Sequence, residues 1–186
     1  PFMGRFTPDG RHYLTGNLYW GPDVVGTWTE APRGDVTAIR FAEQEVDGAV
    51  RHYLVGRAET GASPEGVAIS PDGRWAVTTN LEVSYAPAED PRHTPFSSLT
   101  LIRIAPDTGR LTTVGTYAFD GVLPEAAAWD ASSRFVAVAN YDQLDPATPG
   151  GSIDFWRLAD GAEPRLVKLR ASVAAPHGPH SIVLAP

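Results

Sequence analysis

Short apolar runs alternate with turn residues along the whole chain, and some of these runs recur at a nearly fixed spacing. Three of them begin with Arg and end six residues later in Asn: Arg11–Asn17, Arg74–Asn80 and Arg134–Asn140. Their arginines stand 63 and 60 residues apart. Self-similarity at a long period is the signature of a repeat architecture. We therefore expect three copies of one structural unit.

A turn sequence precedes each of these runs. Pro-Asp-Gly occupies residues 8–10 and 71–73, and a degraded version, Asp-Ala-Ser-Ser, occupies residues 130–133. Pro presets φ, Asp bonds to its own backbone and Gly supplies a positive φ, so these segments predict tight turns. The runs upstream of the later turns, 66–69 and 126–129, are short enough to be strands.

Each unit also contains later apolar runs. The third run, with Arg at its end, covers 36–40, 99–103 and 153–157, and a fourth run is clearest at 110–119. Four short strands per unit, joined by turns and without a helix-period segment, are typical of a β-propeller blade. The third run of the second unit is apolar on both faces, as expected if blades stack on one another.

These patterns predict an all-β chain of four-stranded antiparallel blades. The blades cover about 1–61, 62–121 and 122–176, and residues 177–186 begin the next blade because Pro179–Pro186 matches Pro64–Pro71. Propellers close with about four to eight blades. We therefore expect residues 1–186 to form a single segment of a six- to eight-bladed ring. Its further blades would come from a longer chain or, as the less favoured alternative, from other subunits.

Composition narrows the classes of function. The formal charge of −7 and the absence of a basic stripe argue against nucleic-acid binding. No apolar run approaches the roughly 18 residues that span a bilayer, so we expect a soluble protein. The lack of Cys removes disulfides and thiolate metal sites but leaves periplasmic, secreted and cytoplasmic locations open. Standard catalytic strings are missing, so any chemistry must use residues from several blades.

The first strand of each blade lines the central channel of a propeller. The candidate catalytic residues lie where these first strands begin, at the mouth of this channel. The residue after Pro is Phe2, Glu65, Glu125 or His180. Two carboxylates and an imidazole, Glu65, Glu125 and His180, can support acid–base chemistry or hold a divalent cation. The alternative is that each Glu caps backbone amides or faces channel water. No cofactor is evident, a divalent cation is possible, and no metal ligands are assigned.

Candidate ligand-binding residues gather on the same face, where the long loops 18–34, 81–96 and 141–150 connect second to third strands. An Asn repeated in every blade ends the second strand there and can bind a polar ligand, or it can anchor the next loop. The positions that differ between blades are better candidates for specificity. The candidates are Asn17, Asn80, Asn140, Tyr19, Glu82, Asp142 and His93.

The unit Ser-Pro-Asp-Gly-Arg…Asn, preceded by Pro-x-Gly-Val-Ala-Ile, resembles the YVTN-type repeat of bacterial β-propellers. It is also similar to the seven-bladed lactonase family that includes 6-phosphogluconolactonase-like proteins. The resemblance covers nearly the whole chain. Pro179-His180-Ser181 is similar to a Pro-His segment of those lactonases, where a channel His is a suspected catalytic group. The resemblance thus implies that His180 is catalytic, with Glu65 or Glu125 as its partner.

Two functions are compatible with these observations. One is a binding or scaffold propeller that recognises a small polar ligand or a protein through the long loops between second and third strands, on what we call the top face. The other is a hydrolase of a sugar lactone, with His or Glu as general base. A propeller fold hosts many unrelated functions, and the blades of about 60 residues are longer than the usual 40–50 of propeller repeats. The sequence therefore favours the binding function.

Overall fold

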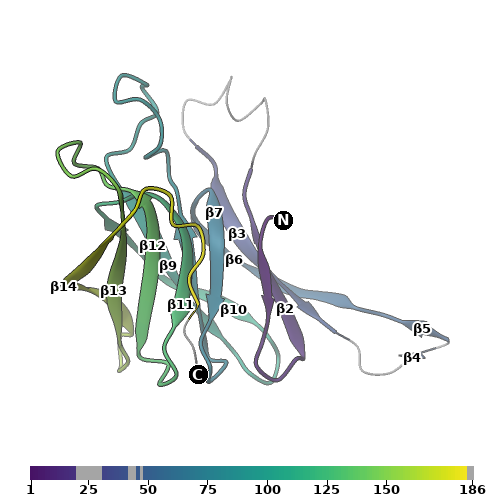
Figure 1. The fold of residues 1–186 in the computed structure, drawn as a ribbon. Coiled ribbons are helices and arrows are strands. Elements are labelled where there is room, and N and C mark those ends of the chain that lie inside the picture. The colour runs from purple at the N-terminus through teal and green to yellow at the C-terminus, as the bar shows by residue number, and fades with distance from the viewer. Residues whose placement is uncertain (20–30, 42–44, 47, 184–186) are drawn as a thin grey trace.

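The computed structural model describes residues 1–19, 31–41, 45–46 and 48–183, and these form fourteen β-strands (Figure 1). Twelve of the strands make three four-stranded antiparallel sheets, each a simple meander. Blade 1 contains β1 (Gly4–Phe6), β2 (His12–Asn17), β3 (Arg33–Arg40) and β6 (Tyr53–Ala62). Blade 2 contains β7 (Pro64–Ile69), β8 (Trp75–Asn80), β9 (Ser97–Ile104) and β10 (Leu111–Phe119). Blade 3 contains β11 (Val122–Trp129), β12 (Phe135–Asp142), β13 (Gly151–Ala159) and β14 (Arg165–Ala175).

The all-β fold of four-stranded antiparallel blades predicted from the sequence is therefore confirmed. The sequence patterns did not reveal one addition to blade 1. Strands β4 (Glu45–Val46) and β5 (Ala49–Val50) pair as a small hairpin that projects from this blade (Figure 1). In the described ranges of the chain, no helix is long and apolar enough to cross a membrane.

The turns between first and second strands form through the side chains that the sequence suggested. Asp9 Oδ1 accepts hydrogen bonds from Thr7 Oγ1 at 2.6 Å and from the Arg11 backbone N–H at 3.0 Å, while Gly10 has φ +70°. The turn at 70–73 repeats these contacts. In the degraded copy at 130–133, Asp130 stands where blade 2 has Ser70, and Ser132 stands where it has Asp72. Asp130 accepts the hydrogen bonds of the turn from Ser132 Oγ and the Arg134 N–H, and Ser133 adopts the positive φ. The turn geometry therefore survives the loss of Pro and Gly.

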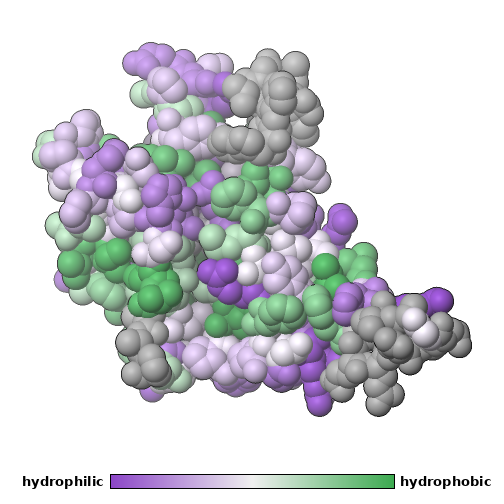
Figure 2. Space-filling model, turned by 45° about the vertical axis from the view of Figure 1, so that its right-hand side comes forward, coloured by the Kyte–Doolittle hydropathy of each residue, from purple (hydrophilic) through white to green (hydrophobic). Residues whose placement is uncertain are grey.

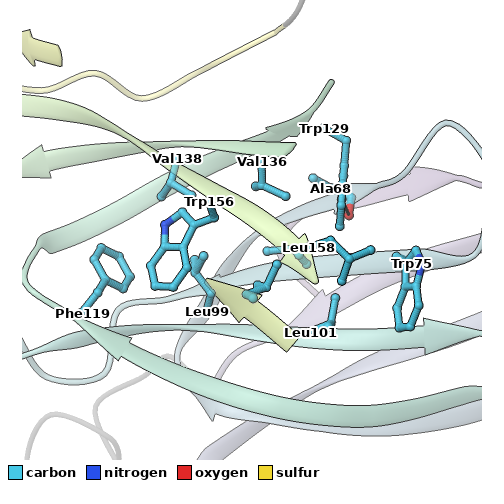
Figure 3. Packing of buried hydrophobic residues seen from close by; sticks show 12 residues of the cluster. Ala68, Trp75, Leu99, Leu101, Phe119, Trp129, Val136, Val138, Trp156 and Leu158 are labelled. Atoms are coloured by element: carbon cyan, nitrogen blue, oxygen red, sulfur yellow. Dashed lines mark hydrogen bonds between the residues drawn. The ribbon is translucent and has the colours of Figure 1, made fainter. Parts of the chain in front are cut away.

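Blade 2 is packed on both faces, as the stacking of blades requires. Leu99 and Leu101 lie in a core that blade 2 shares with blade 3. The largest side chains of this core include Trp75 and Trp156 (Figure 3). Ile102 and Ile104 point to the opposite side, into a core shared with blade 1. All six residues of β8 are buried. The expectation of a middle strand buried on both faces is thus confirmed.

The first strands of the blades lie close together near the axis of the stack. A Cβ added to Gly66 would lie 2.9 Å from the carbonyl oxygen of Glu125, so β7 and β11 approach each other at a distance that only Gly permits. Together the first strands line an open groove of about 260 Å³, to which the C-terminal residues Ile182 and Val183 also contribute.

The predicted first strand of a fourth blade does not form within the described residues. Residues 176–183 contain no strand, and residues 184–186 lie outside the described part of the chain. A first strand pairs with the second strand of its own blade, which the described residues do not include. The segment still docks like a first strand: a Cβ on Gly151 would meet Pro179 Cδ at 2.5 Å, and one on Gly34 would meet Pro64 Cδ at 2.3 Å.

The long loops of blades 2 and 3 lie at one end of the stack, and the tight turns lie at the other (Figure 1). Most of the corresponding loop of blade 1, predicted at 18–34, lies outside the described residues. Figure 2 shows that the loops at the top of the view are mostly hydrophilic, whereas hydrophobic residues gather lower on the same side. We call the end that carries the loops the top face.

Candidate functional site

The first strands of blades 2 and 3 each contain a β-bulge at the predicted catalytic carboxylate. Pairing between β7 and β8 steps from Pro64↔Asn80 to Gly66↔Thr79, so Glu65 has no partner in the ladder. Pairing between β11 and β12 skips Glu125 in the same way. A bulge leaves one residue unpaired and turns its side chain out of the regular alternation, which is why bulges are frequent next to active sites.

A left-handed backbone residue stands two positions before each of the three candidate catalytic residues. Such a conformation is unusual for a residue other than Gly, and for a bulky side chain it stores strain. The three residues are Ser63 at φ 52°, Leu123 at φ 49° and Gly178 at φ 87°. The chain therefore approaches Glu65, Glu125 and His180 through the same bend, followed each time by Pro. His180 shares its register position with the two glutamates although its own segment is not a strand.

The three candidate side chains come together at the top of the channel. His180 Nδ1 lies 3.4 Å from Glu125 Oε2, and the two side chains are 66% and 14% exposed. Burial, followed by a hydrogen bond and the charge of Glu125, raises the pKa of Glu65 from 4.5 to about 8, while His180 acts in the opposite direction. At neutral pH Glu65 is therefore mostly protonated.

The buried oxygen of Glu65 supports the same protonation state. Glu65 Oε2 is buried and has no hydrogen-bond partner among the described residues. An unpartnered buried carboxylate oxygen is costly, whereas a protonated carboxyl group can donate to a neighbouring carboxylate. The pair Glu65–Glu125 therefore holds one proton between two carboxyl groups, next to an exposed imidazole.

Two tyrosines that the sequence did not indicate are related to this group, Tyr141 by contact and Tyr85 through electrostatics. The ring of Tyr141 contacts the imidazole of His180 edge-on, with 5.3 Å between ring centroids. Tyr85, in the loop 81–96, has its pKa raised mainly by burial, with a contribution from the charge of Glu65. Tyr141 directly follows the repeated Asn140, which is the one signal that could have identified it. Nothing in the sequence brings Tyr85 to Glu65.

His177 is a third neighbour that the sequence analysis did not select. Its Nδ1 lies 3.5 Å from Asp142 Oδ2, and its ring contacts Tyr141 with 4.5 Å between centroids. Asp142 is one of the predicted ligand-binding residues, and it lies at the end of β12 on the top face. The structure therefore links this candidate, through His177 and Tyr141, to the candidate catalytic residue His180.

The three repeated asparagines lie between the second and third strands of their blades. Asn80 and Asn140 are fully buried, and Asn17 is half-buried. Each amide nitrogen donates to two side chains of the third strand at 2.6–3.0 Å. The acceptor pairs are Asp35 and Thr37, Ser98 and Thr100, and Ser152 and Asp154. These contacts give a structural reason for the repeated Asn, and a role in ligand binding stays a prediction.

Glu82 uses both carboxylate oxygens to connect neighbouring segments. Oε2 accepts a hydrogen bond from the backbone N–H of Ala62 at 3.2 Å, and Oε1 accepts one from Ser98 Oγ at 2.5 Å. Glu82 itself has φ 52°. The side chain thus joins the end of blade 1 to the third strand of blade 2.

The last two predicted ligand-binding residues, Tyr19 and His93, belong to the loops of blades 1 and 2. Tyr19 is 50% exposed at the start of the loop whose next residues lie outside the described part of the chain. His93 Nδ1 lies 2.9 Å from the carbonyl oxygen of Ala86, within the loop 81–96. Their roles in binding stay predictions.

A divalent cation at this site also stays a prediction. Over the ranges that the structure describes, no three His, Asp or Glu side chains come together closely enough to hold a metal ion. Within the group of Glu65, Glu125 and His180, the pKa of one carboxyl is raised and the other carboxyl lies against the imidazole.

Solved structures share this fold at low sequence identity. The chain superposes on a putative 6-phosphogluconolactonase from Bacteroides uniformis with a TM-score of 0.56 and 13% identity, covering 94% of this chain and 40% of that one. The periplasmic gluconolactonase of Pseudomonas aeruginosa superposes with a TM-score of 0.54 and 16% identity, covering 93% of this chain and 57% of that one. A hypothetical selenium-binding protein from Sulfolobus tokodaii superposes with a TM-score of 0.57 and 12% identity, covering 94% of this chain and 41% of that one.

These similarities show the fold. The chain spans between 40% and 57% of the length of the structures just named. No protein-family profile matches the sequence, and no curated protein matches it either. The three blades are therefore a β-propeller fold of the kind found in lactonases, and the activity has to be argued from the site.

Proposed function

We propose that these blades contribute the acid–base residues of a hydrolase that acts on a sugar lactone. The observation that carries this proposal is the protonated Glu65 beside Glu125, which in turn pairs with the exposed His180. A neutral acid and a base held within one group are what the opening of an ester ring requires. The lactonases among the structures of similar fold support the same choice.

The proposed reaction begins with water that is activated by His180. Glu125 faces Nδ1 of the imidazole, which leaves Nε2 to take a proton from water. The water oxygen forms a bond to the lactone carbonyl carbon. Glu65 redirects the carboxyl proton that it shares with Glu125 in the free protein to the carbonyl oxygen, where it stabilises the developing charge. The bond between this carbon and the ring oxygen then breaks. The ring oxygen receives the proton from the imidazolium, which gives a hydroxy acid.

This proposal is tested with the intact protein and a panel of aldonolactones, including D-glucono-1,5-lactone, by following acid release at constant pH. The variant His180→Ala should lose at least about a hundredfold in kcat, the usual contribution of a general base, with an almost unchanged melting temperature because the side chain is exposed. The matched control His52→Ala replaces an exposed imidazole outside the site and should keep full activity. An intact protein that hydrolyses none of the panel would overturn the proposal.

A binding protein without catalysis is the second candidate. It is favoured by the loop 81–96, which is held by its own hydrogen bonds, such as Thr94 Oγ1 accepting from the Val83 N–H at 2.9 Å. Its polar surface lies on the top face (Figure 2). On this proposal, titration with D-gluconate should detect binding without turnover, and deletion of residues 86–95 should weaken the binding while the fold is kept. Unchanged binding after the deletion would contradict it.

A further inference from the structure

Blade 3 departs from the repeat next to the candidate catalytic group. In blade 2, Glu82 is fully engaged by a backbone amide and a hydroxyl. Asp142 stands at the equivalent position, two residues after the repeated Asn, but its Oδ2 faces the imidazole of His177 at 3.5 Å. The side chains of Asp142 and His177 are 37% and 58% exposed. A carboxylate that connects two segments in blade 2 is therefore open to solvent in blade 3.

The residue directly after the repeated Asn also changes. In blade 2 this residue is Leu81, which is 1% exposed and packs in the interior. In blade 3 it is the half-buried Tyr141, whose ring contacts both His177 and His180. The backbone N–H of Gly178 donates to the carbonyl oxygen of Tyr141 at 3.0 Å, which holds the C-terminal segment against β12. The ring thus connects the Asp142–His177 pair to the catalytic group.

The chemistry of these three side chains fits a polyhydroxylated ligand. A carboxylate accepts hydrogen bonds from hydroxyl groups, and an imidazole can both donate and accept. An aromatic ring supplies apolar surface for the C–H groups of a sugar, with few polar groups needed to fix its orientation. The repeat offers the comparison: the other described blades carry no such combination at these positions.

We infer that Tyr141, Asp142 and His177 form a subsite that binds the hydroxyl groups of a polyhydroxylated ligand placed against His180. The description of this ligand as a lactone rests on the proposed function. The subsite itself rests on the exposed Asp142–His177 pair and its contact with Tyr141.

Two lactones distinguish the subsite from the reacting group. The intact protein and its variants Asp142→Asn and His177→Ala are assayed with D-glucono-1,5-lactone and with δ-valerolactone, which has no hydroxyl groups. Each variant should raise KM for gluconolactone about tenfold, the effect of losing one hydrogen bond to a charged group. Neither should change kcat for gluconolactone or KM for δ-valerolactone. Asp107→Asn, at an exposed turn on the opposite face, is the matched control and should change nothing.

A binding measurement separates this inference from the proposed function. D-Glucono-1,5-lactam, an amide analogue with the same hydroxyl groups, is titrated into each variant by calorimetry. Weaker binding to both site variants supports the subsite even if the intact protein hydrolyses no lactone, which would refute the proposed function alone. The inference is overturned if the lactam binds the variants as it binds the wild type, or if the variants lower kcat equally for both lactones. The second result would mean that these side chains position His180 and do not contact the ligand.

Discussion

The protonated state of Glu65 predicts that the stability of the protein depends on pH in a defined window. The pKa of Glu65 is raised from 4.5 to about 8 in the fold, mainly by burial. Below pH 4.5 the group is neutral in both folded and unfolded chains, and its neutral form fits the site. As the pH rises toward 8, ionisation of Glu65 lowers the free energy of the unfolded chain, whereas the group stays protonated in the folded chain. The contribution of Glu65 to stability is therefore lost as the pH rises through this window.

The size of the effect follows from the same shift. At about 1.4 kcal/mol per pKa unit, the whole interval corresponds to roughly 5 kcal/mol as an upper bound. Water reaches the group beside the exposed His180, so we expect about 2 kcal/mol after screening. The variant Glu65→Gln cannot ionise, and its amide can still donate to Glu125. This variant should therefore lack this loss and become more stable than the wild type near pH 8 by about 2 kcal/mol.

The assay is urea unfolding followed by Trp fluorescence at pH 5, 6, 7 and 8, for the wild type and the variant. The quantity that isolates Glu65 is the difference between the two unfolding free energies at each pH, since other titrating groups contribute equally to both. Glu163→Gln, an exposed carboxylate far from the channel in sequence, is the control and should leave the pH dependence unchanged. A difference that stays constant from pH 5 to pH 8 would refute the assignment of a protonated Glu65.

Three further substitutions and one control test the buried groups of the blades. Asn80→Ala removes a buried amide that holds β8 to β9, and it should cost about 2 kcal/mol in urea unfolding. Gly66→Ala adds a Cβ 2.9 Å from a carbonyl oxygen of β11 and should cost about 1–3 kcal/mol, while Gly56→Ala, where a Cβ meets nothing within 4 Å, should cost less than 1 kcal/mol. Burial lowers the pKa of His12 below 6.5, so stability should fall as the pH drops below 6.5, and His12→Leu should remove that acid-side loss; an unchanged acid limb would contradict it.

Much of the fold could be predicted because it depends on local pattern. The alternation of Leu99 and Leu101 against Ile102 and Ile104 fixed which side chains face each neighbouring blade, since successive side chains of a strand point to opposite faces. Pro-Asp-Gly fixed the turns because Asp bonds to the nearby backbone and Gly adopts a positive φ, both of which are local properties. The hairpin of β4 and β5 was missed because its strands are only two residues long, below the length at which a periodic pattern can be recognised.

Only part of the candidate site could be predicted from the sequence. Register alone related Glu65, Glu125 and His180, because each follows Pro in the same unit. The bulges that turn the two glutamates toward each other depend on pairing with the next strand, and no local pattern shows an extra residue. Tyr85 and His177 reach the site from segments whose paths depend on tertiary contacts. Their contribution could not be predicted from spacing.

The repeated bend before each first strand has a consequence for how this surface can change. Ser63, Leu123 and Gly178 each adopt a positive φ before a Pro in three successive units, and Pro64 and Pro179 pack against Gly34 and Gly151. The residue after Pro is therefore reached through a left-handed residue in all three units, although its chemistry changes from carboxylate to imidazole. The surroundings still differ, because Glu125 is 14% exposed and His180 is 66% exposed. The shared bend thus fixes where this side chain stands, and the residue itself sets the chemistry of that position.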